Sequence, residues 1–334
     1  MKKVNFAVIG FGHIGKRHVE MIKRNPYSEI VAIVDVNENL KNYSAKIPFF
    51  KTLDDLFVSD LEIDVINIAT PNGFHTEHAL KALSNNLNVV IEKPMSLNTL
   101  DAKKIINKSI EVNKYVFTVM QNRYSPPSKW LKDIMINKIL GDIYMVQLNC
   151  YWNRDERYYT KDSWHGDKKL DGGTLFTQFS HFIDLLYWLF GDIINIKTKL
   201  MDFNHNSLTD FEDSGTVSFE FVDGGIGTIN FSTSVYQENL ESSLTIIGQN
   251  GSIKVGGQYM NKVEYCNIKN YDMPKLKETR PGNDYGSYKG SAQNHDFVIN
   301  NVVNVLNNKE KIKTNSFEGM KVVEIIEKIY NLQK

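Results

Sequence analysis

The most constraining feature of the sequence is a glycine-rich turn close to its start. Residues 10–15 are GFGHIG, with the spacing G-x-G-x-x-G, and they follow the apolar run VNFAVI at 4–9. The residues after the turn predict a helix. In this context Gly10 permits a tight turn, Gly12 lets the backbone approach a pyrophosphate, and Gly15 allows the helix to pack closely on the strand. The turn therefore predicts a dinucleotide-binding βα unit whose helix N-terminus faces the phosphates.

An aspartate stands where such a unit selects its dinucleotide. Asp35 ends the second predicted strand, 20 residues after Gly15, and the chain continues Val36-Asn37-Glu38 with no arginine. A carboxylate there accepts hydrogen bonds from the ribose hydroxyls and repels a 2'-phosphate. The sequence therefore predicts NAD rather than NADP.

The first 121 residues alternate between apolar runs and helical segments with short connections. This pattern is typical of a parallel sheet with helices on both faces, so we expect an N-terminal doubly wound α/β domain over 1–121. The predicted strands lie at 4–9, 29–36, 64–70, 87–91 and 115–122.

From residue 122 onward long β-rich segments dominate. The steps Asp223-Gly224-Gly225 and Asn250-Gly251 are hairpin signals, which favour a large, open, mostly antiparallel sheet in an α+β domain over 122–334. An open sheet face needs a cover, so we expect a homodimer or homotetramer. Residues 267–290 predict a long loop. Predicted strands lie at 142–152, 195–203, 214–234 and 242–255, and predicted helices at 127–137, 181–190 and 316–330.

Composition limits the possible partners and the compartment. The chain of 334 residues has 39 basic and 39 acidic residues, so no net field attracts nucleic acid or an anionic membrane. No apolar run reaches the roughly 18 residues that a membrane span needs. The start MKKVNFAVIGFG lacks the cleavage site of a signal peptide. Two cysteines suit a reducing compartment, and we expect a cytoplasmic protein.

A lysine follows the fourth predicted strand, in VIEKPM. Ligands of open α/β sheets gather at the carboxyl ends of the strands, and 70–72 and 92–94 both follow such ends. Lys93 is thereby placed beside the cofactor, where an ammonium group can bind a substrate hydroxyl and take part in proton transfer. The alternative is a solvated charge at a strand end.

Several motifs of the chain, taken together, are similar to those of a known protein family. GFGHIG, ATPNGFH and EKP, followed by a β-rich domain with DGGTLFTQFSHFIDLLYWLFG, resemble the Gfo/Idh/MocA family of oxidoreductases across essentially the whole chain. The resemblance implies NAD-dependent oxidation of a sugar CH–OH group, with Lys93 and His181 as the catalytic pair and no metal. From the residues alone, a capping role for His181 at its helix N-terminus is equally open.

The resemblance also implies two sets of binding residues. The substrate set is Asn122, Arg154, Tyr159, Thr177 and Gln178. The cofactor set is Gly10, Phe11, Gly12, His13, Ile14, Gly15, Asp35, Thr70, Asn72, His75, Glu92, Lys93, Gln121 and Trp164.

One position departs from the family pattern. Where the family commonly has an aspartate four residues before the histidine, this chain has Thr177. A threonine binds a hydroxyl but cannot act as a carboxylate base, which concentrates proton transfer on Lys93 and His181.

A narrower resemblance accounts for this departure. MQNRYSPP, YWNRDERYY, SWHG and SYKGSAQNHD are similar to the WlbA/WbpB-type branch, which oxidises UDP-N-acetylglucosaminuronic acid at C3 in bacterial lipopolysaccharide synthesis and also lacks the aspartate. That branch implies a UDP-sugar substrate and a partner aminotransferase. Arg154 and Arg157 would suit a carboxylate or diphosphate, or belong to a solvated loop. The aromatic residues in and beside these motifs either line a site for the sugar or pack against another domain or subunit. They are Tyr158, Tyr159, Trp164, Tyr285 and Tyr288.

Two alternative functions stay open at this point. One is oxidation or reduction of a free sugar or cyclitol by an enzyme of the same family. The other is a non-catalytic sensor of NAD or sugar, which the presence of both Lys93 and His181 disfavours.

Overall fold

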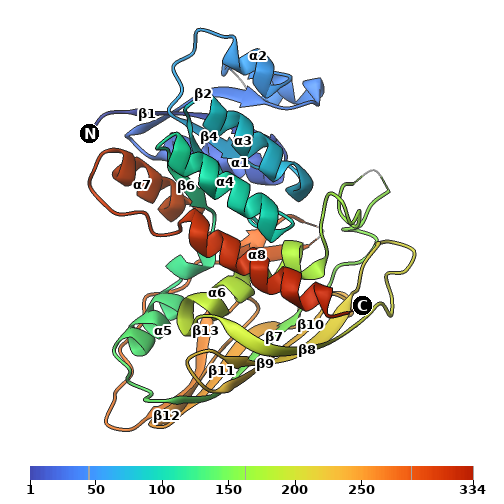
Figure 1. The fold of residues 1–334 in the computed structure, drawn as a ribbon, viewed down its shortest axis with the longest axis vertical. Helices are drawn as coiled ribbons and strands as arrows, with labels where there is room; N and C mark the ends of the chain where they lie inside the picture. The colour runs from blue at the N-terminus through green and yellow to red at the C-terminus, as the bar shows by residue number, and fades with distance from the viewer. Residues whose placement is uncertain (44–45, 162, 287, 334) are drawn as a thin grey trace. The chain divides into compact units, whose positions relative to one another are not determined.

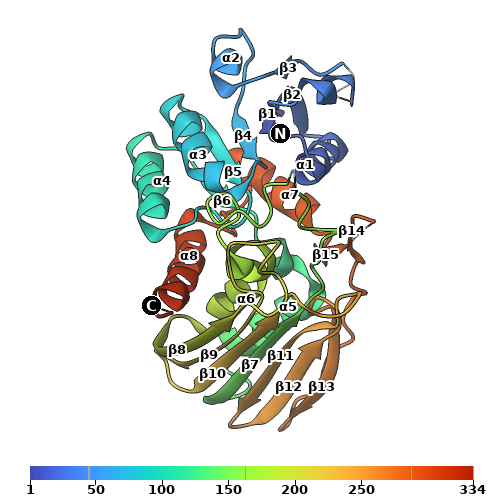
Figure 2. The ribbon, with the colours of Figure 1, turned by 90° about the vertical axis from the view of Figure 1, so that its right-hand side faces the viewer.

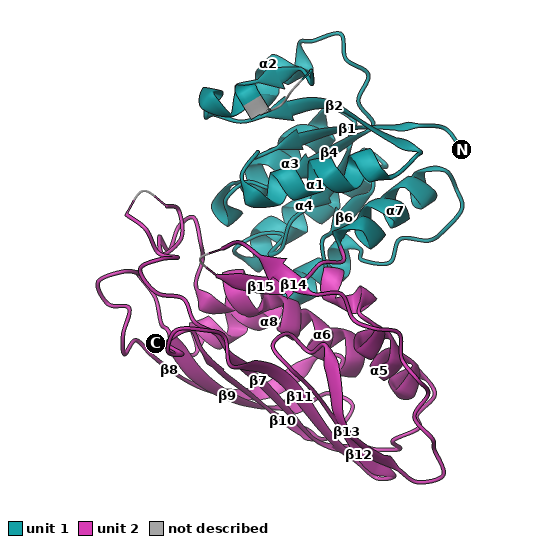
Figure 3. Cartoon of the chain, turned by 180° about the vertical axis from the view of Figure 1, so that it is seen from behind, with its two compact units in different colours: residues 1–120, 295–323 teal, residues 121–294, 324–334 magenta. Residues whose placement is uncertain are grey.

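The computed structural model describes residues 1–43, 46–161, 163–286 and 288–333. The chain divides into two compact units, coloured separately in Figure 3. Unit 1 comprises Met1–Met120 and His295–Val323, and unit 2 comprises Gln121–Asn294 and Glu324–Lys334. Residues 295–323 thus group with unit 1, whereas a division at 121/122 places them in the second domain.

Unit 1 is a six-stranded sheet in the order β3-β2-β1-β4-β5-β6, and every neighbouring pair is parallel. Helices cover the sheet, as Figure 1 shows, which confirms the predicted doubly wound fold. The strands are β1 (Val4–Ile9), β2 (Ser28–Val34), β3 (Phe49–Phe50), β4 (Val65–Ile68), β5 (Asn88–Ile91) and β6 (Val116–Thr118). The helices are α1 (His13–Arg24), α2 (Leu53–Phe57), α3 (His75–Ser84), α4 (Thr99–Glu111) and α7 (His295–Leu306).

The order of strands explains where a ligand site can form. Every residue of β4 and β5 is buried, as expected for strands covered on both faces. Because β1 lies between β2 and β4, the connection that leaves β1 runs toward β2 and the one that leaves β4 runs toward β5, so the two diverge at the carboxyl edge of the sheet. The turns after β1, β4 and β5 meet at that edge, and they carry the glycine turn, Thr70 and Lys93.

Unit 2 contains a seven-stranded sheet in the order β13-β12-β11-β7-β10-β9-β8. All its neighbouring pairs are antiparallel except β7 and β10, so the predicted, mostly antiparallel sheet is confirmed. The strands are β7 (Ile143–Tyr151), β8 (Ile193–Met201), β9 (Ser214–Phe221), β10 (Ile226–Ser232), β11 (Glu241–Gly248), β12 (Gly251–Gly256) and β13 (Lys262–Ile268).

Helices cover one face of this sheet. Figure 2 shows α5 (Pro126–Ile136) and α6 (Ser180–Phe190) on the same side of it. Along β7, Val146, Leu148 and Cys150 are buried, whereas Met145 and Gln147 are exposed, which is the alternation of a half-covered sheet. The homo-oligomer that would cover the other face stays a prediction.

Some elements were not expected from the sequence. Residues 267–290 are not one long loop, because β13 reaches Ile268 and β14 (Gly282–Asp284) pairs with β15 (Lys289–Ala292). Strands of three and four residues are too short to show an alternating pattern. The helix α7 was also missed, while α8 (Ser316–Asn331) agrees with the predicted last helix. Among the described residues, no helix has both the length and the hydropathy that spanning a bilayer requires.

Candidate active site

The glycine turn has the geometry that a bound pyrophosphate needs. Gly10 has φ +85°, and a Cβ added there would lie 2.5 Å from the Ala69 carbonyl oxygen. A Cβ at Gly15 would lie 1.8 Å from the carbonyl oxygen of Gly10, so α1 packs directly on the turn. At Gly12 a Cβ would meet nothing within 4 Å. Two glycines thus allow close internal contacts, and the third leaves an open, exposed backbone surface.

Asp35 lies beside this turn. Its Oδ2 accepts the Phe11 amide hydrogen at an N–O distance of 2.6 Å, and its Oδ1 accepts that of Asn37 at 2.8 Å. A carboxylate oxygen accepts two hydrogen bonds, so the group is held by main chain and keeps capacity for a ribose diol. His13 is exposed and Ile14 half-buried in the first turn of α1. These residues fit an NAD molecule.

The ends of β4 and β5 are held together by His75. Its Nδ1 lies 2.7 Å from the carbonyl oxygen of Pro94 and its Nε2 lies 2.9 Å from that of Thr70. Complete burial lowers the pKa of His75, partly offset by these two carbonyls, so the ring is neutral and donates one hydrogen bond. His75 therefore supports the segments that carry Thr70 and half-buried Lys93, and it does not present its ring to a ligand. Asn72, at the start of the short turn before α3, is also buried.

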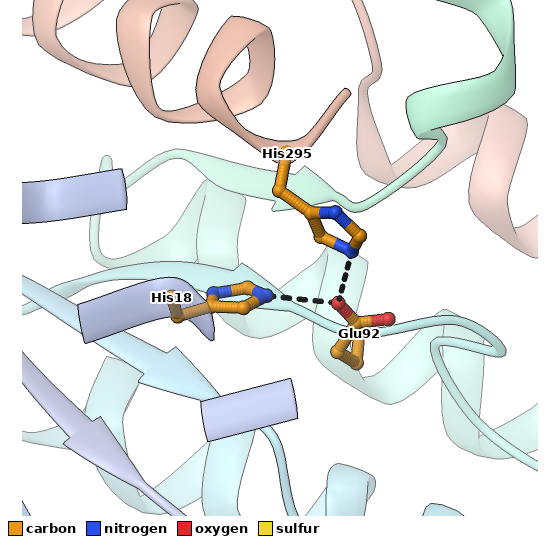
Figure 4. Close-up of side chains that lie close together, drawn as sticks. All are labelled: His18, Glu92 and His295. Atoms are coloured by element: carbon orange, nitrogen blue, oxygen red, sulfur yellow. Dashed lines mark hydrogen bonds and ion pairs between the residues drawn. The ribbon is translucent and has the colours of Figure 1, made fainter. Parts of the chain in front are cut away.

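Glu92, directly before Lys93, belongs to a buried polar cluster shown in Figure 4. Its Oε1 accepts the Nε2 hydrogen of His18 at 2.8 Å, and the Nε2 of His295 lies 3.7 Å from the same oxygen. The amide of Asn67 donates to the other ring nitrogen of His18 at 2.8 Å. Glu92 Oε2 accepts the Lys93 amide hydrogen at 3.2 Å. The cluster therefore anchors the strand end that presents Lys93.

The charges within this cluster follow from burial and hydrogen bonding. Burial alone would raise the pKa of Glu92, but the hydrogen bond from His18 and the charge of the neighbouring Lys93 lower it to about 2. Burial lowers the pKa of His295 to about 3. At neutral pH Glu92 is thus an anion and His295 is neutral. Two histidines and a glutamate could hold a metal ion, but the direct bonds to Glu92 and Asn67 satisfy His18 without one.

In unit 2, His181 lies in the first turn of α6 and is buried. Gln121, in the short helix η3 (Gln121–Tyr124), donates its amide hydrogen to His181 Nε2 at 3.3 Å, which leaves this nitrogen as a base. The guanidinium of Arg123 in the same turn donates from Nε to Asp184 Oδ2 at 2.8 Å and from a terminal nitrogen to Oδ1 at 2.5 Å. This buried, forked ion pair fixes η3 against α6.

The turn η3 also offers polar atoms to a ligand. Gln121 Oε1 and Asn122 Nδ2 are buried, and the described residues supply neither with a hydrogen-bond partner. Asn122 Oδ1 accepts from Ser291 Oγ at 2.5 Å. One acceptor and one donor therefore remain in the turn that contacts His181.

Thr177, where the family has an aspartate, lies in a π-helical turn (Leu175–Phe179) just before α6. Its hydroxyl donates to the side chain of Asp171 and lies 3.0 Å from the Asp171 carbonyl oxygen. The other carboxylate oxygen of Asp171 accepts the Gly166 amide hydrogen at 3.0 Å. A carboxylate is thus hydrogen-bonded to Thr177, although it belongs to residue 171 and not to the position where the family commonly has its aspartate.

The neighbouring Gln178 is fixed at both ends of its amide. Its Oε1 accepts from Arg154 Nε at 2.9 Å, and its Nε2 donates to the Tyr158 hydroxyl at 2.8 Å. Arg154 is only 1% exposed, and its terminal nitrogens donate to Asn239 and to the carbonyl oxygens of 153 and 289. The rings of Trp152, Tyr158 and Tyr288 lie 4.7 to 5.1 Å from its guanidinium carbon. Arg154 therefore holds Gln178 in place.

The other residues expected at the site make contacts of their own, and Tyr159 adjoins Tyr158. Arg157 binds Asp155 beside it, at 2.9 Å from Nε to Oδ1, as a side chain on the surface. Tyr159 packs with Tyr158 and Phe211 in a small buried cluster. Trp164 stacks on His165 with 4.0 Å between the ring centroids.

Sequence reasoning missed several residues of the site, among them His18, His295 and Asp171. Asp171 opens the DGG of the quoted motif, so its position was visible. Its partner was not, because the short contact with Thr177 depends on the turn between residues 171 and 177. His295 reaches Glu92 from a segment 203 positions later in the chain.

Comparison with known proteins agrees with this geometry. The profile of the oxidoreductase family with an NAD-binding Rossmann fold matches residues 4–120, and that of the GFO/IDH/MocA C-terminal domain matches 129–254. The chain belongs to the Gfo/Idh/MocA family. It is therefore an NAD-dependent oxidoreductase, which confirms the enzyme class and the cofactor expected from the sequence.

Individual relatives span almost the whole chain. The WlbA dehydrogenase of Bordetella pertussis, solved with NADH and UDP-GlcNAcA, is 28% identical over 99% of this chain and 97% of its own, with a TM-score of 0.88. The Chromobacterium violaceum WlbA dehydrogenase, solved with the same ligands, is 27% identical over 100% and 94%, with a TM-score of 0.89. Glucose-6-phosphate 3-dehydrogenase of Bacillus subtilis is 24% identical over 99% of this chain and 96% of its own.

The three glycines predict different outcomes for the same change. Gly15→Ala should lower the free energy of unfolding by about 2 kcal/mol or more, because the new methyl group overlaps the Gly10 carbonyl oxygen. Gly12→Ala should lose no more than about 1 kcal/mol as a weaker helix cap, yet weaken NAD binding about tenfold or more because its methyl occupies the open surface. Urea denaturation and calorimetry measure the two effects. Equal NAD affinity in Gly12→Ala and the unmodified enzyme would contradict the assignment.

The buried His295 predicts a pH dependence of stability. The unfolded chain binds a proton at this ring near pH 6.5, whereas the folded chain does so only near pH 3, so the free energy of unfolding falls as the pH drops through this window. In His295→Gln this slope between pH 6 and 4 should be shallower by up to about 1.4 kcal/mol per pH unit. Urea denaturation at several pH values measures it. A variant with an unchanged slope would show that His295 is already charged.

Proposed function

We propose that this enzyme oxidises UDP-linked 2-acetamido-2-deoxy-glucuronic acid at C3, giving the 3-keto sugar and NADH. The observation that carries the proposal is the likeness, along nearly the full length of both chains, to the WlbA dehydrogenase solved with NADH and UDP-GlcNAcA. The motif region around α6 supports it, because Thr177 and Gln178 stand where other branches of the family carry an aspartate and its neighbour.

The reaction removes a hydride and a proton from one CH–OH group. When bound, NAD accepts the hydride together with both bonding electrons. The proton of the hydroxyl must go to a base of the protein, and the proposal assigns this to Lys93 and His181. His181 is suited to the task because Gln121 donates to its Nε2, which leaves that nitrogen unprotonated. Lys93 is suited because its main chain is anchored by Glu92.

Gln178 and η3 would bind the substituents around the reacting carbon by hydrogen bonds. The Gln178 amide gives one hydrogen to Tyr158 and keeps a second, which can bind a carboxylate or acetamido oxygen. Asn122 Nδ2 is a second such donor and is buried. For Arg154, the uronate ligand expected from the sequence, we infer a role in positioning Gln178, because its guanidinium donates to Gln178, Asn239 and two carbonyl groups within the protein.

The product would be a ketone next to an acetamido group. A carbonyl carbon at that place is the substrate of amino transfer, so an aminotransferase is the class of enzyme that would consume it, as in the making of a diamino sugar for a surface glycan. Removal of the ketone also draws the oxidation forward, because a 3-keto sugar is otherwise reduced back.

The substrate is tested with a panel of UDP-hexuronates, free hexoses, hexose phosphates and inositols. We expect UDP-N-acetylglucosaminuronic acid to give the highest kcat/KM, and deuterium placed at its C3 to appear on the nicotinamide ring of NADH. Absorbance of NADH measures turnover and mass spectrometry measures the label. Faster oxidation of glucose 6-phosphate or inositol would replace the sugar-nucleotide assignment with one of the alternatives.

The catalytic pair is tested by two substitutions. Lys93→Met and His181→Asn should each lower kcat by about a hundredfold or more, because each removes an acid-base group. NAD affinity measured by calorimetry should change little in either variant. Lys23→Met, exposed in the last turn of α1 and away from the glycine turn, is the matched control and should keep full turnover. Undiminished kcat in Lys93→Met or His181→Asn would remove that residue from the mechanism.

A further inference from the structure

The contact between Thr177 and Asp171 has chemical consequences for the substrate. Both side chains are buried, with 8% and 1% of their surfaces exposed. One carboxylate oxygen of Asp171 accepts the Thr177 hydroxyl, and the other accepts the Gly166 amide hydrogen at 3.0 Å. Both oxygens of Asp171 are therefore occupied by donors of the protein.

This arrangement determines the polarity of Thr177. A hydroxyl group has one hydrogen and two lone pairs. Because its hydrogen is given to Asp171, Thr177 can offer only lone pairs to any further group. A substrate atom that meets Thr177 Oγ1 must then be a donor, such as a hydroxyl, and cannot be a carboxylate or carbonyl oxygen.

The negative charge of Asp171 strengthens this acceptor. A hydrogen bond to an ionised group polarises the donor, and the effect is large in a buried, poorly solvated site. Two donors of the protein, the Thr177 hydroxyl and the Gly166 amide, meet the two oxygens of Asp171, and hydrogen bonds of this kind favour the ionised carboxylate.

We propose that Asp171 is a positioning residue that turns Thr177 into a fixed, polarised acceptor for a hydroxyl group of the sugar. The carboxylate that position 177 lacks is supplied six residues earlier and acts through the threonine. No proton is transferred to Asp171. The inference rests on the proposed sugar oxidation and deepens it, because it assigns a hydroxyl, and not the uronate, to the side of the substrate that faces Thr177.

The replacement Asp171→Asn tests the role of the carboxylate. The Gly166 amide is a fixed main-chain donor, so the new amide must turn its oxygen toward Gly166 and its NH2 group toward Thr177. Thr177 then accepts from the NH2 group, and its own hydrogen turns to the carbonyl oxygen of residue 171, which lies 3.0 Å away. The variant keeps the volume and the internal hydrogen bonds, but it occupies one lone pair of Thr177 and removes the charge that polarises the hydroxyl.

A double-mutant cycle separates this role from a structural one. We expect Asp171→Asn and Thr177→Val each to lower kcat/KM about ten- to hundredfold, the range for a lost hydrogen bond to a charged group. The double variant should lose no more than either single variant, because the two residues act as one unit. Thr177→Ser, the matched control, keeps the hydroxyl and should stay within about threefold of the unmodified enzyme.

Two further measurements make the outcome specific. NAD affinity and the melting temperature should be unchanged in Asp171→Asn, and a sugar lacking the hydroxyl that Thr177 binds should be oxidised equally well by this variant and the unmodified enzyme. Full activity of Asp171→Asn, losses that multiply in the double variant, or a melting temperature that falls with activity would overturn the proposal.

The cycle is measured with whichever sugar of the panel the unmodified enzyme oxidises fastest. If that sugar is not a UDP-hexuronate, the proposed function fails while the role of Asp171 is still decided. If it is a UDP-hexuronate and the cycle is additive, the function stands and the role of Asp171 fails.

Discussion

The catalytic strand end of unit 1 depends on one buried anion. Glu92 lies at the carboxyl end of β5, where an unpaired carboxylate would destabilise the fold by several kcal/mol. His18 from α1 and the main chain of Lys93 satisfy its two oxygens, and His295 covers it from α7. Two helices and one strand are therefore joined at the residue that precedes the proposed acid-base group. The hydrogen bonds of this polar cluster are directional, so they fix the orientation of the segment that carries Lys93, which apolar packing would not do.

Unit 2 contains a buried cation, Arg154, whose charge must also be stabilised inside the protein. Arg154 is enclosed by aromatic rings, and its guanidinium is bound by the neutral acceptors of Gln178, Asn239 and two carbonyl groups. Burial lowers the pKa of Arg154, but a guanidinium stays charged under all ordinary conditions. The faces of three π-systems stabilise that charge without a carboxylate. A buried cation thus orients Gln178, while the carboxylate of Asp171 accepts the hydroxyl of Thr177.

Sequence reasoning predicted the architecture well because it depends on local patterns. The strands of unit 1 are continuous apolar runs, and the glycine turn and Asp35 lie in one βα unit, so their contacts were readable from spacing. The roles of His75 and Arg154 were not, because whether a polar side chain faces a ligand or the interior depends on packing that no spacing records. The pairs Glu92–His295 and Asp171–Thr177 depend on tertiary contacts and on a π-helical turn, which have no one-dimensional signature.

The return of residues 295–323 to unit 1 has a consequence for synthesis of the chain. A ribosome releases the six strands of the NAD-binding sheet long before it releases α7. Until then His295 cannot cover Glu92, and the face of α1 that α7 packs against is exposed. Domains usually fold from the N-terminus as they emerge, but this one must wait for nearly the whole polypeptide. During that interval the nascent chain presents a surface that chaperones recognise, and a ribosome that stalls within unit 2 leaves a nucleotide-binding domain without its last helix.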